Sequence, residues 1–356
     1  MKRIADSHIH IRFFEFEHAL KLFSDIAECG VTDAAILSLP YYGVIANLAA
    51  VYFKMTNKDL DLRAFGGFHT VDQYAEIPPE VQLEALIKLG IDGFKIMSCP
   101  TMRRYCGIGI DDEYYEKMFA LLEREGLPVN FHVADPEEFW DEGGSYADPS
   151  FASKKQLCDE ALRVAKRHPN LKIIFAHFFF LSNFPEEAER IMEEYPNVYF
   201  DLTPGTEMYY NFDKNIEYWR GFFKKYKNRL LFGTDANANK DCNKELEALV
   251  YRKLTEKTDY FTQNCYGKDF VIRGLELDEE TADAIAYGNY FEIFGKEKKP
   301  VNLELFYEYC ERVLHDLEAM EGDPYQENRV KIVPKLDIYP SKQVSLDFLR
   351  RVLKEK

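Results

Sequence analysis

The chain has 356 residues, of which 46% are hydrophobic, and its 61 acidic and 45 basic residues give a formal net charge of −16. This length and hydrophobic share are enough for one large core. The acidic balance, without a run of Lys and Arg that could follow a phosphate backbone, argues against a nucleic-acid partner. No apolar run reaches the roughly 20 residues of a membrane helix.

The seven cysteines are scattered along the chain, and none forms a C-x-x-C pair. An odd and unpatterned set of cysteines is typical of reduced thiols in the cytosol. The N-terminus enters a predicted strand at once, without an apolar leader. We therefore expect a soluble, cytoplasmic protein that has no membrane partner.

Strand and helix patterns alternate along the first two thirds of the chain. Short apolar strands are predicted at 3–7, 32–39, 62–69, 93–98, 128–133, 171–177, 198–203 and 229–235. Helices with apolar residues at helical spacing are predicted between them, at 16–29, 42–54, 79–89, 114–125, 154–167, 186–194 and 216–225. Gly30, Gly90 and Gly126 follow three of these helices, as expected of glycine at a helix C-terminus.

Eight short apolar strands that are separated by helices predict parallel pairing, with both faces of the sheet covered. The closed arrangement of eight such units is the (β/α)8 TIM barrel, an α/β fold. An open doubly wound sheet is the structural alternative. The dinucleotide-binding form of that sheet lacks its signature here, because no G-x-G-x-x-G follows the first strand.

The last third of the chain has a different pattern. The stretch 236–277 is long and irregular, and it follows the eighth strand on the catalytic side of a barrel, where a lid, a site wall or a surface elaboration is expected. Further helices are predicted at 278–294, 303–320 and 345–353. We expect a barrel at 1–295 and a C-terminal helical extension at 296–356 that packs on its outside.

Residues that can bind metal or transfer protons fall at the ends of the predicted strands. His8 and His10 lie two residues apart on the first strand, so their side chains share a face and could hold one metal ion. For this pair alone, one packed and one surface histidine is the alternative. Later strands carry His69, Lys95, His132, His177 and Asp235. Barrel active sites lie at this C-terminal rim.

The ordered set of His8-x-His10, His132, His177 and Asp235 resembles the pattern of the amidohydrolase superfamily. The segments ADSHIH, GLPVNFHV, PNLKIIFAH, NVYFDLT, RLLFGTD and AYGNYFEIFG are similar to its amidohydrolase-related (amidohydrolase 2) branch. That branch contains metal-dependent TIM-barrel hydrolases and non-oxidative decarboxylases. The resemblance covers approximately 2–295.

The resemblance implies that His8, His10, His132 and Asp235 hold one divalent metal ion, with Zn²⁺ favoured over Mn²⁺ or another divalent ion. Asp235 would bind the metal and also accept the proton of the attacking water. His177 would act as an acid or base beside a single metal, or as a ligand of a second metal in a binuclear site.

Four more residues are candidates for lining the site or supporting its ligands. Lys95 would bridge two metals as a carboxylated lysine in binuclear members, whereas a lysine in a similar context accompanies a single metal in the amidohydrolase-related branch. We expect one metal. Arg12 follows the histidine pair and could bind a substrate carboxylate, His69 is a site wall or a packed histidine, and Asp201 is a hydrogen-bond acceptor behind the ligands.

These observations predict an enzyme that hydrolyses a C–N or C–O bond of a small-molecule substrate by metal-activated water. The alternative is non-oxidative decarboxylation of an aromatic or unsaturated carboxylic acid. Decarboxylase relatives follow the last aspartate with Tyr-Pro or Trp-Pro, and here Ala236 and Asn237 follow it. A binding barrel without catalysis would show gaps in the ligand set, and the sequence shows none. A homodimer is common in this branch, but the sequence shows no interface.

Overall fold

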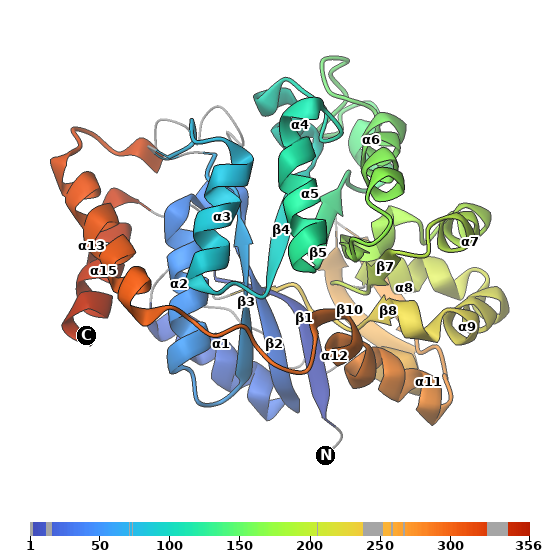
Figure 1. The fold of residues 1–356 in the computed structure, drawn as a ribbon. Helices are drawn as coiled ribbons and strands as arrows, with labels where there is room; N and C mark the ends of the chain where they lie inside the picture. Colours follow the sequence, from blue (N-terminus) through green and yellow to red (C-terminus); the bar gives the residue numbers. More distant parts are fainter. Residues whose placement is uncertain are drawn as a thin grey trace.

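The computed structural model describes residues 3–11, 16–70, 72, 74–204, 206–237, 252–257, 259–265, 268–325 and 341–356. In this part of the chain, the central sheet is built from β1 Ile4–His10, β2 Val31–Leu37, β3 Asp61–Gly67, β4 Gly93–Ser98, β5 Val129–Val133, β6 Ile173–Phe175, β7 Val198–Asp201, β8 Leu230–Leu231 and β9 Ala236–Asn237. All neighbouring strands of this sheet pair in parallel. Figure 1 shows helices arranged around these strands.

The sheet closes through the segment for which the sequence predicts a single eighth strand. The predicted range 229–235 contains only the short strand β8, and β9 follows directly after it. These two strands stand at the two ends of the sheet order β8-β7-β6-β5-β4-β3-β2-β1-β9. Between them, Ser7 donates its backbone N–H to Phe232 and Asp235 donates its own to His8, at 3.0 and 2.9 Å. One segment thus joins both edges, and the predicted TIM barrel is confirmed.

The helices between the strands agree with the prediction to within a few residues. They are α1 Phe16–Glu28, α2 Val44–Thr56, α3 Pro79–Leu89, α5 Glu116–Glu125, α6 Lys154–Arg167, α7 Pro185–Glu194 and α9 Ile216–Lys225. Gly90 ends α3 in the left-handed conformation at φ 97°, and its N–H bonds to the carbonyls of Leu86 and Ile87. Two helices, α4 Pro100–Cys106 and α8 Thr206–Asp213, are absent from the prediction, because seven or eight residues are too few to show a clear helical period.

The barrel interior has an apolar floor. Inward-facing residues of the strands, including Ala5, Leu37 and Phe65, pack with Tyr290 and Phe294 at the end of the chain's barrel portion. These last two residues belong to α12 Asn289–Phe294, which follows α11 Glu279–Asp283 and a π-helical turn at Ala284–Gly288. Polar side chains therefore lie at the opposite, C-terminal end of the strands.

The stretch 236–277 is not irregular throughout, contrary to the prediction. It contains an antiparallel pair, β10 Asp259–Cys265 and β11 Lys268–Arg273, and β11 packs against α8. The role of this stretch as a lid or site wall stays a prediction.

Two long helices, α13 Leu303–Ala319 and α15 Lys342–Lys354, follow the barrel and pack on each other. Phe348 of α15 lies against Phe16 of α1, with ring centroids 5.1 Å apart. Helix α13 contacts α3, so the two helices pack on the outside of the barrel (Figure 1). The division into parts at 1–295 and 296–356 stays a prediction. None of the described helices combines the length and the apolar character that crossing a bilayer requires.

Candidate metal centre and its polar network

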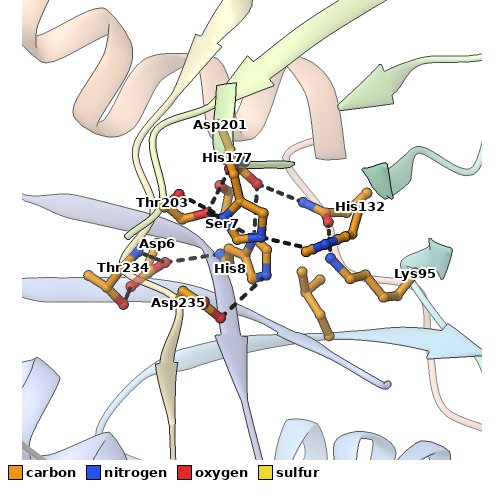
Figure 2. A network of polar contacts seen from close by, with 12 residues as sticks. Asp6, Ser7, His8, Lys95, His132, His177, Asp201, Thr203, Thr234 and Asp235 are labelled. Carbon is orange, nitrogen blue, oxygen red and sulfur yellow. Dashed lines mark hydrogen bonds and ion pairs between the residues drawn. The ribbon is translucent and has the colours of Figure 1, made fainter. Parts of the chain in front are cut away.

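A β-bulge turns both histidines of β1 into the barrel. Between Asp6 and Ile9, β1 advances three residues while β2 advances two, from Ala34 to Ile36. Such an extra residue re-aims the side chains that follow it. Ile4 therefore packs in the outer core, whereas His8 lies in the interior polar network (Figure 2). His8 and His10 are both buried, with 1% and 3% of their surface exposed.

The hydrogen-bond partners of these two rings fix their tautomers. His10 Nδ1 lies 2.8 Å from the carbonyl oxygen of Leu37, which can only accept a hydrogen bond. His8 Nδ1 lies 2.9 Å from the carboxylate of Asp201. Each Nδ1 therefore carries the proton, and burial lowers the pKa of His8 to about 3, which keeps its ring neutral. Each Nε2 is left with a lone pair.

Three proton-free ligand atoms converge at this point. The Nε2 atoms of His8 and His10 are 3.0 Å apart, and Asp235 Oδ1 lies 3.7 and 3.1 Å from them. Without a cation, such an arrangement of lone pairs is repulsive. Two imidazole nitrogens and one carboxylate oxygen are ligands that divalent transition metals accept, so the donor set fits a metal ion.

Asp235 reaches the two histidines from an unusual backbone conformation. Its φ is 56°, in the left-handed region, and a non-glycine residue there often marks a functional site. Asp6 supports this turn, because its carboxylate accepts from the N–H of His8 at 2.9 Å and from the hydroxyl of Thr234 at 2.6 Å. Asp235 itself keeps 20% of its side chain exposed, so solvent reaches it from the barrel mouth.

His132 and His177 form a second pair beside this group. His132 Nδ1 lies 3.0 Å from His177 Nε2, and His132 Nε2 lies 3.6 Å from the carboxylate of Asp135. His177 Nδ1 donates to the carbonyl of Thr203 at 2.7 Å, so its Nε2 has the lone pair. Burial and the neighbouring His132 lower the pKa of His177 to about 4. A neutral His177 can accept a proton, and the place of His132 among the ligands stays a prediction.

His177 begins a left-handed turn just after β6, which ends before the predicted strand does. Four successive residues, from His177 to Phe180, have φ between 53° and 57°, a conformation that is strained for each of them. Packing holds the turn in place, because the rings of Phe179 and Phe175 stack at 4.0 Å. The N–H of His177 also donates to Asp201 at 2.8 Å.

Asp201 is the centre of the network. It accepts from His8 Nδ1, from the amide of Asn130 at 2.9 Å, from the N–H of His177, and from the hydroxyl of Thr203 at 2.7 Å. Its side chain is fully buried. Burial alone would raise its pKa, but the interactions with the two histidines and Thr203 outweigh this and hold the pKa well below its usual range. One carboxylate thus orients a metal-ligand candidate and an acid-base candidate.

Lys95 joins the network through Asn130. Its Nζ donates to the amide oxygen of Asn130 at 2.6 Å, and burial lowers the pKa of Lys95 to about 8. Sequence reasoning missed Asn130, although a polar residue two positions before His132 in an apolar strand was a usable signal. On β5 these two side chains point into the same barrel interior.

Two other candidates lie apart from this network. His69 follows β3 and faces Asp72, with 3.8 Å between its Nδ1 and the carboxylate. Arg12 lies outside the described residues.

Comparison with known proteins places the chain in a family. The family model described as "Amidohydrolase" (Amidohydro_2) matches residues 42–295, a range that begins after the two histidines of β1. No curated protein matches the chain.

Solved structures with a similar fold have low sequence identity. One is an uncharacterized TIM-barrel protein from Bordetella bronchiseptica, with 14% identity, TM-score 0.51, and coverage of 82% of this chain and 98% of that one. Another is a dihydroxybenzoic acid decarboxylase from Polaromonas with bound manganese and 2-nitroresorcinol. It has 14% identity and a TM-score of 0.50, with coverage of 83% of this chain and 97% of that one. A third is the 4-oxalomesaconate hydratase of Rhodopseudomonas palustris. It has 11% identity and a TM-score of 0.52, with coverage of 88% of this chain and 99% of that one. These likenesses support the fold, and the family match over 42–295 shows that the chain belongs to the amidohydrolase family.

Proposed function

We propose that the protein is a metal-dependent hydrolase that cleaves a C–N or C–O bond of a small organic molecule with metal-activated water. The observation that supports this most is the convergence of three lone pairs, from His8 Nε2, His10 Nε2 and Asp235 Oδ1, at one point of the barrel rim. The protons of the two rings are held on their Nδ1 atoms by oxygen acceptors, so a divalent cation is the species that this arrangement suits.

One metal ion is the proposed stoichiometry, with zinc as the first candidate and manganese as the second. His8, His10 and Asp235 supply three ligands, and His132 is the fourth that the family pattern implies. When bound, the metal lowers the pKa of a water molecule to about 7 and polarises a substrate carbonyl. Lys95 is proposed to remain an ordinary lysine, since its Nζ is already engaged by Asn130 at 2.6 Å.

The proton transfers are assigned to Asp235 and His177. Asp235 is partly exposed, so its carboxylate can take the proton of the attacking water. His177 is held by the Thr203 carbonyl at Nδ1. Its Nε2, which lies 3.0 Å from His132 Nδ1, is the atom proposed to exchange a proton at the leaving group. Asp201 holds His8 and His177 in place, Asn130 holds Asp201, and neither takes a proton itself.

Elemental analysis and isotope labelling test this proposal together. Protein purified without chelator should contain about one divalent ion per chain, and a screen of amides, lactones and esters should find a product that incorporates oxygen from labelled water. A variant in which both His8 and His10 are replaced by alanine is the control and should hold no metal.

Three outcomes would contradict parts of the proposal. Two metal equivalents with a carboxylated Lys95 would refute the single metal. Release of carbon dioxide from an aromatic or unsaturated acid, without label from water, would make the protein a decarboxylase that uses the same residues. Absence of metal under every loading condition would refute the enzyme itself.

A further inference from the structure

A cavity of about 490 Å³ lies outside the polar network of the metal-centre candidate. Its walls include Pro40 after β2, His69 after β3, Met97 on β4, and Met102 and Tyr105 of α4. Its volume falls in the range of roughly 300–1,000 Å³ that small-molecule sites occupy.

Hydrogen bonds between the loops hold this cavity open. The hydroxyl of Thr70 donates to the carbonyl of Pro40 at 2.9 Å, and the hydroxyl of Tyr105 donates to the carbonyl of Thr70 at 2.9 Å. The N–H of His69 donates to the side chain of Gln82 at 2.8 Å. Three successive loops of the barrel rim are thus joined, so the walls are formed before any ligand arrives.

Two wall residues relate the cavity to the strand ends that carry the metal-centre candidate. Met97 is the register partner of His132 on the neighbouring strand, and it lies two residues after Lys95, so its side chain points to the same barrel interior. Pro40 lies three residues after Leu37, whose carbonyl accepts from His10. Both wall residues thus lie at or just after strand ends of the rim that carries the metal-ligand candidates.

The chemistry of the lining selects an uncharged ligand. Among the described residues, the wall contains neither Lys nor Arg, and its one acidic residue, Glu76, is exposed to solvent. Burial lowers the pKa of His69, which favours the neutral form of this wall residue. A carboxylate or phosphate placed here would find no counter-charge in the wall, which is unfavourable.

The same lining favours an aromatic ring. Met97 and Met102 present flexible thioethers, which make favourable contacts with aromatic rings. Phe68 and Tyr115 add ring faces, and their centroids lie 5.9 Å apart.

We infer that this cavity binds an uncharged aromatic group at the non-reacting end of the substrate, while the scissile bond lies at the metal centre. This inference rests on the proposed metal-dependent function. His69 follows a strand but is not part of the metal group. The cavity explains its position, because His69 forms part of the wall of the substrate site.

Binding of a matched probe pair tests the cavity without any need for turnover. We expect 2-naphthol, which is neutral at pH 7, to bind the protein with or without metal, and 2-naphthoate to bind at least tenfold more weakly. Ala75→Phe, which places a ring in the cavity, should weaken 2-naphthol binding at least tenfold, and Ile108→Phe should do the same from another part of the wall. Ala85→Phe is the matched control, since Ala85 lines a separate groove between α3 and α13.

Calorimetry would give the affinities, and thermal unfolding would show that each variant is folded. Equal affinity for the two probes, or unchanged 2-naphthol binding in both filling variants, would overturn the cavity assignment.

A paramagnetic metal then tests the link to the metal centre. In Mn²⁺-loaded protein, the proton resonances of bound 2-naphthol should broaden relative to the Zn²⁺-loaded protein. Bound 2-naphthol without this broadening would separate the cavity from the metal centre and refute the substrate role. Failure of the protein to bind either metal would refute the proposed function instead, and the metal-free binding result would still decide whether the cavity takes a neutral ring.

Discussion

His8 Nδ1 and Asp201 Oδ2 lie 2.9 Å apart in the buried interior of the barrel, although 193 residues separate them in sequence. The contact fixes the proton of His8 on Nδ1 and turns its Nε2 toward His10 and Asp235. Carboxylates behind histidine ligands orient the ring and raise its basicity. The metal-ligand candidate on β1 thus depends on a residue at the end of β7.

Replacement of Asp201 by asparagine should weaken metal binding. Asparagine has no charge, and its amide can present a donor to His8, so the ring loses the partner that fixes its tautomer. We expect Zn²⁺ affinity in a chelator competition to fall by about 10–100-fold. Glu160→Gln is the control, because Glu160 is a buried carboxylate that pairs with Arg103 away from the site. Unchanged affinity in Asp201→Asn would show that the contact has no role in metal binding.

His177→Asn should reduce turnover and leave metal content near that of the wild type. The ring of His177 is held by Thr203 and His132 outside the group of three ligand atoms, so its loss removes an acid or base. The expected decrease in kcat is about 10²–10⁴-fold. His168→Asn, at a buried histidine that contacts Glu123, should keep full activity. Loss of metal together with activity would instead make His177 a ligand.

Lys95 should give the metal-free protein a distinct dependence of stability on pH. Burial lowers its pKa from the ordinary value of 10.5 to about 8 in the folded protein. Between these values the unfolded chain holds a proton that the folded chain has released, so the free energy of unfolding rises with pH, by at most about 1.4 kcal/mol per pH unit. Below pH 8 the lysine is charged in both states and this gain is absent.

Urea unfolding of the wild type and of Lys95→Met, at several values between pH 7.5 and 10.5, would measure this effect. The wild type should gain stability relative to the variant as the pH rises. Lys155→Met removes an exposed lysine, with 83% of its side chain accessible, and should follow the wild type. Parallel curves for the wild type and Lys95→Met would show that Lys95 has an ordinary pKa.

In the left-handed turn at His177 to Phe180, a glycine variant should be more stable than an alanine variant, which is the reverse of the usual order in a helix. At Phe180, where φ is 53°, both substitutions remove the same ring, but only glycine adopts this backbone without strain. Phe180→Gly should therefore be more stable than Phe180→Ala by about 1 kcal/mol. In the exposed Val81 of α3, glycine should be less stable than alanine by about 1 kcal/mol. Thermal unfolding of the four variants checks both comparisons. If the alanine variant were more stable than the glycine variant at both positions, the backbone at Phe180 would not be strained.

Much of the barrel was readable from local pattern. Apolar runs of strand length, helical spacing between them and glycines such as Gly90 at helix ends identify each unit, because these signals depend on neighbours within a few residues. The same periodicity places His8, His10, His132 and Asp235 at strand ends. In a parallel barrel all such ends lie on one rim, so a shared site followed without knowledge of any contact.

Contacts between distant segments determined the features of the barrel and of the site that local pattern did not predict. The bulge in β1 that turns His8 and His10 inward exists only in register with β2, and the division of the eighth strand follows from its pairing with both β7 and β1. Asp201 and Asn130 became the centre of the network because β5 and β7 bring them within 2.9 Å of each other. A sequence pattern states which face a side chain occupies, whereas the closure of the barrel determines which side chains meet there, since that depends on register between strands far apart in the chain.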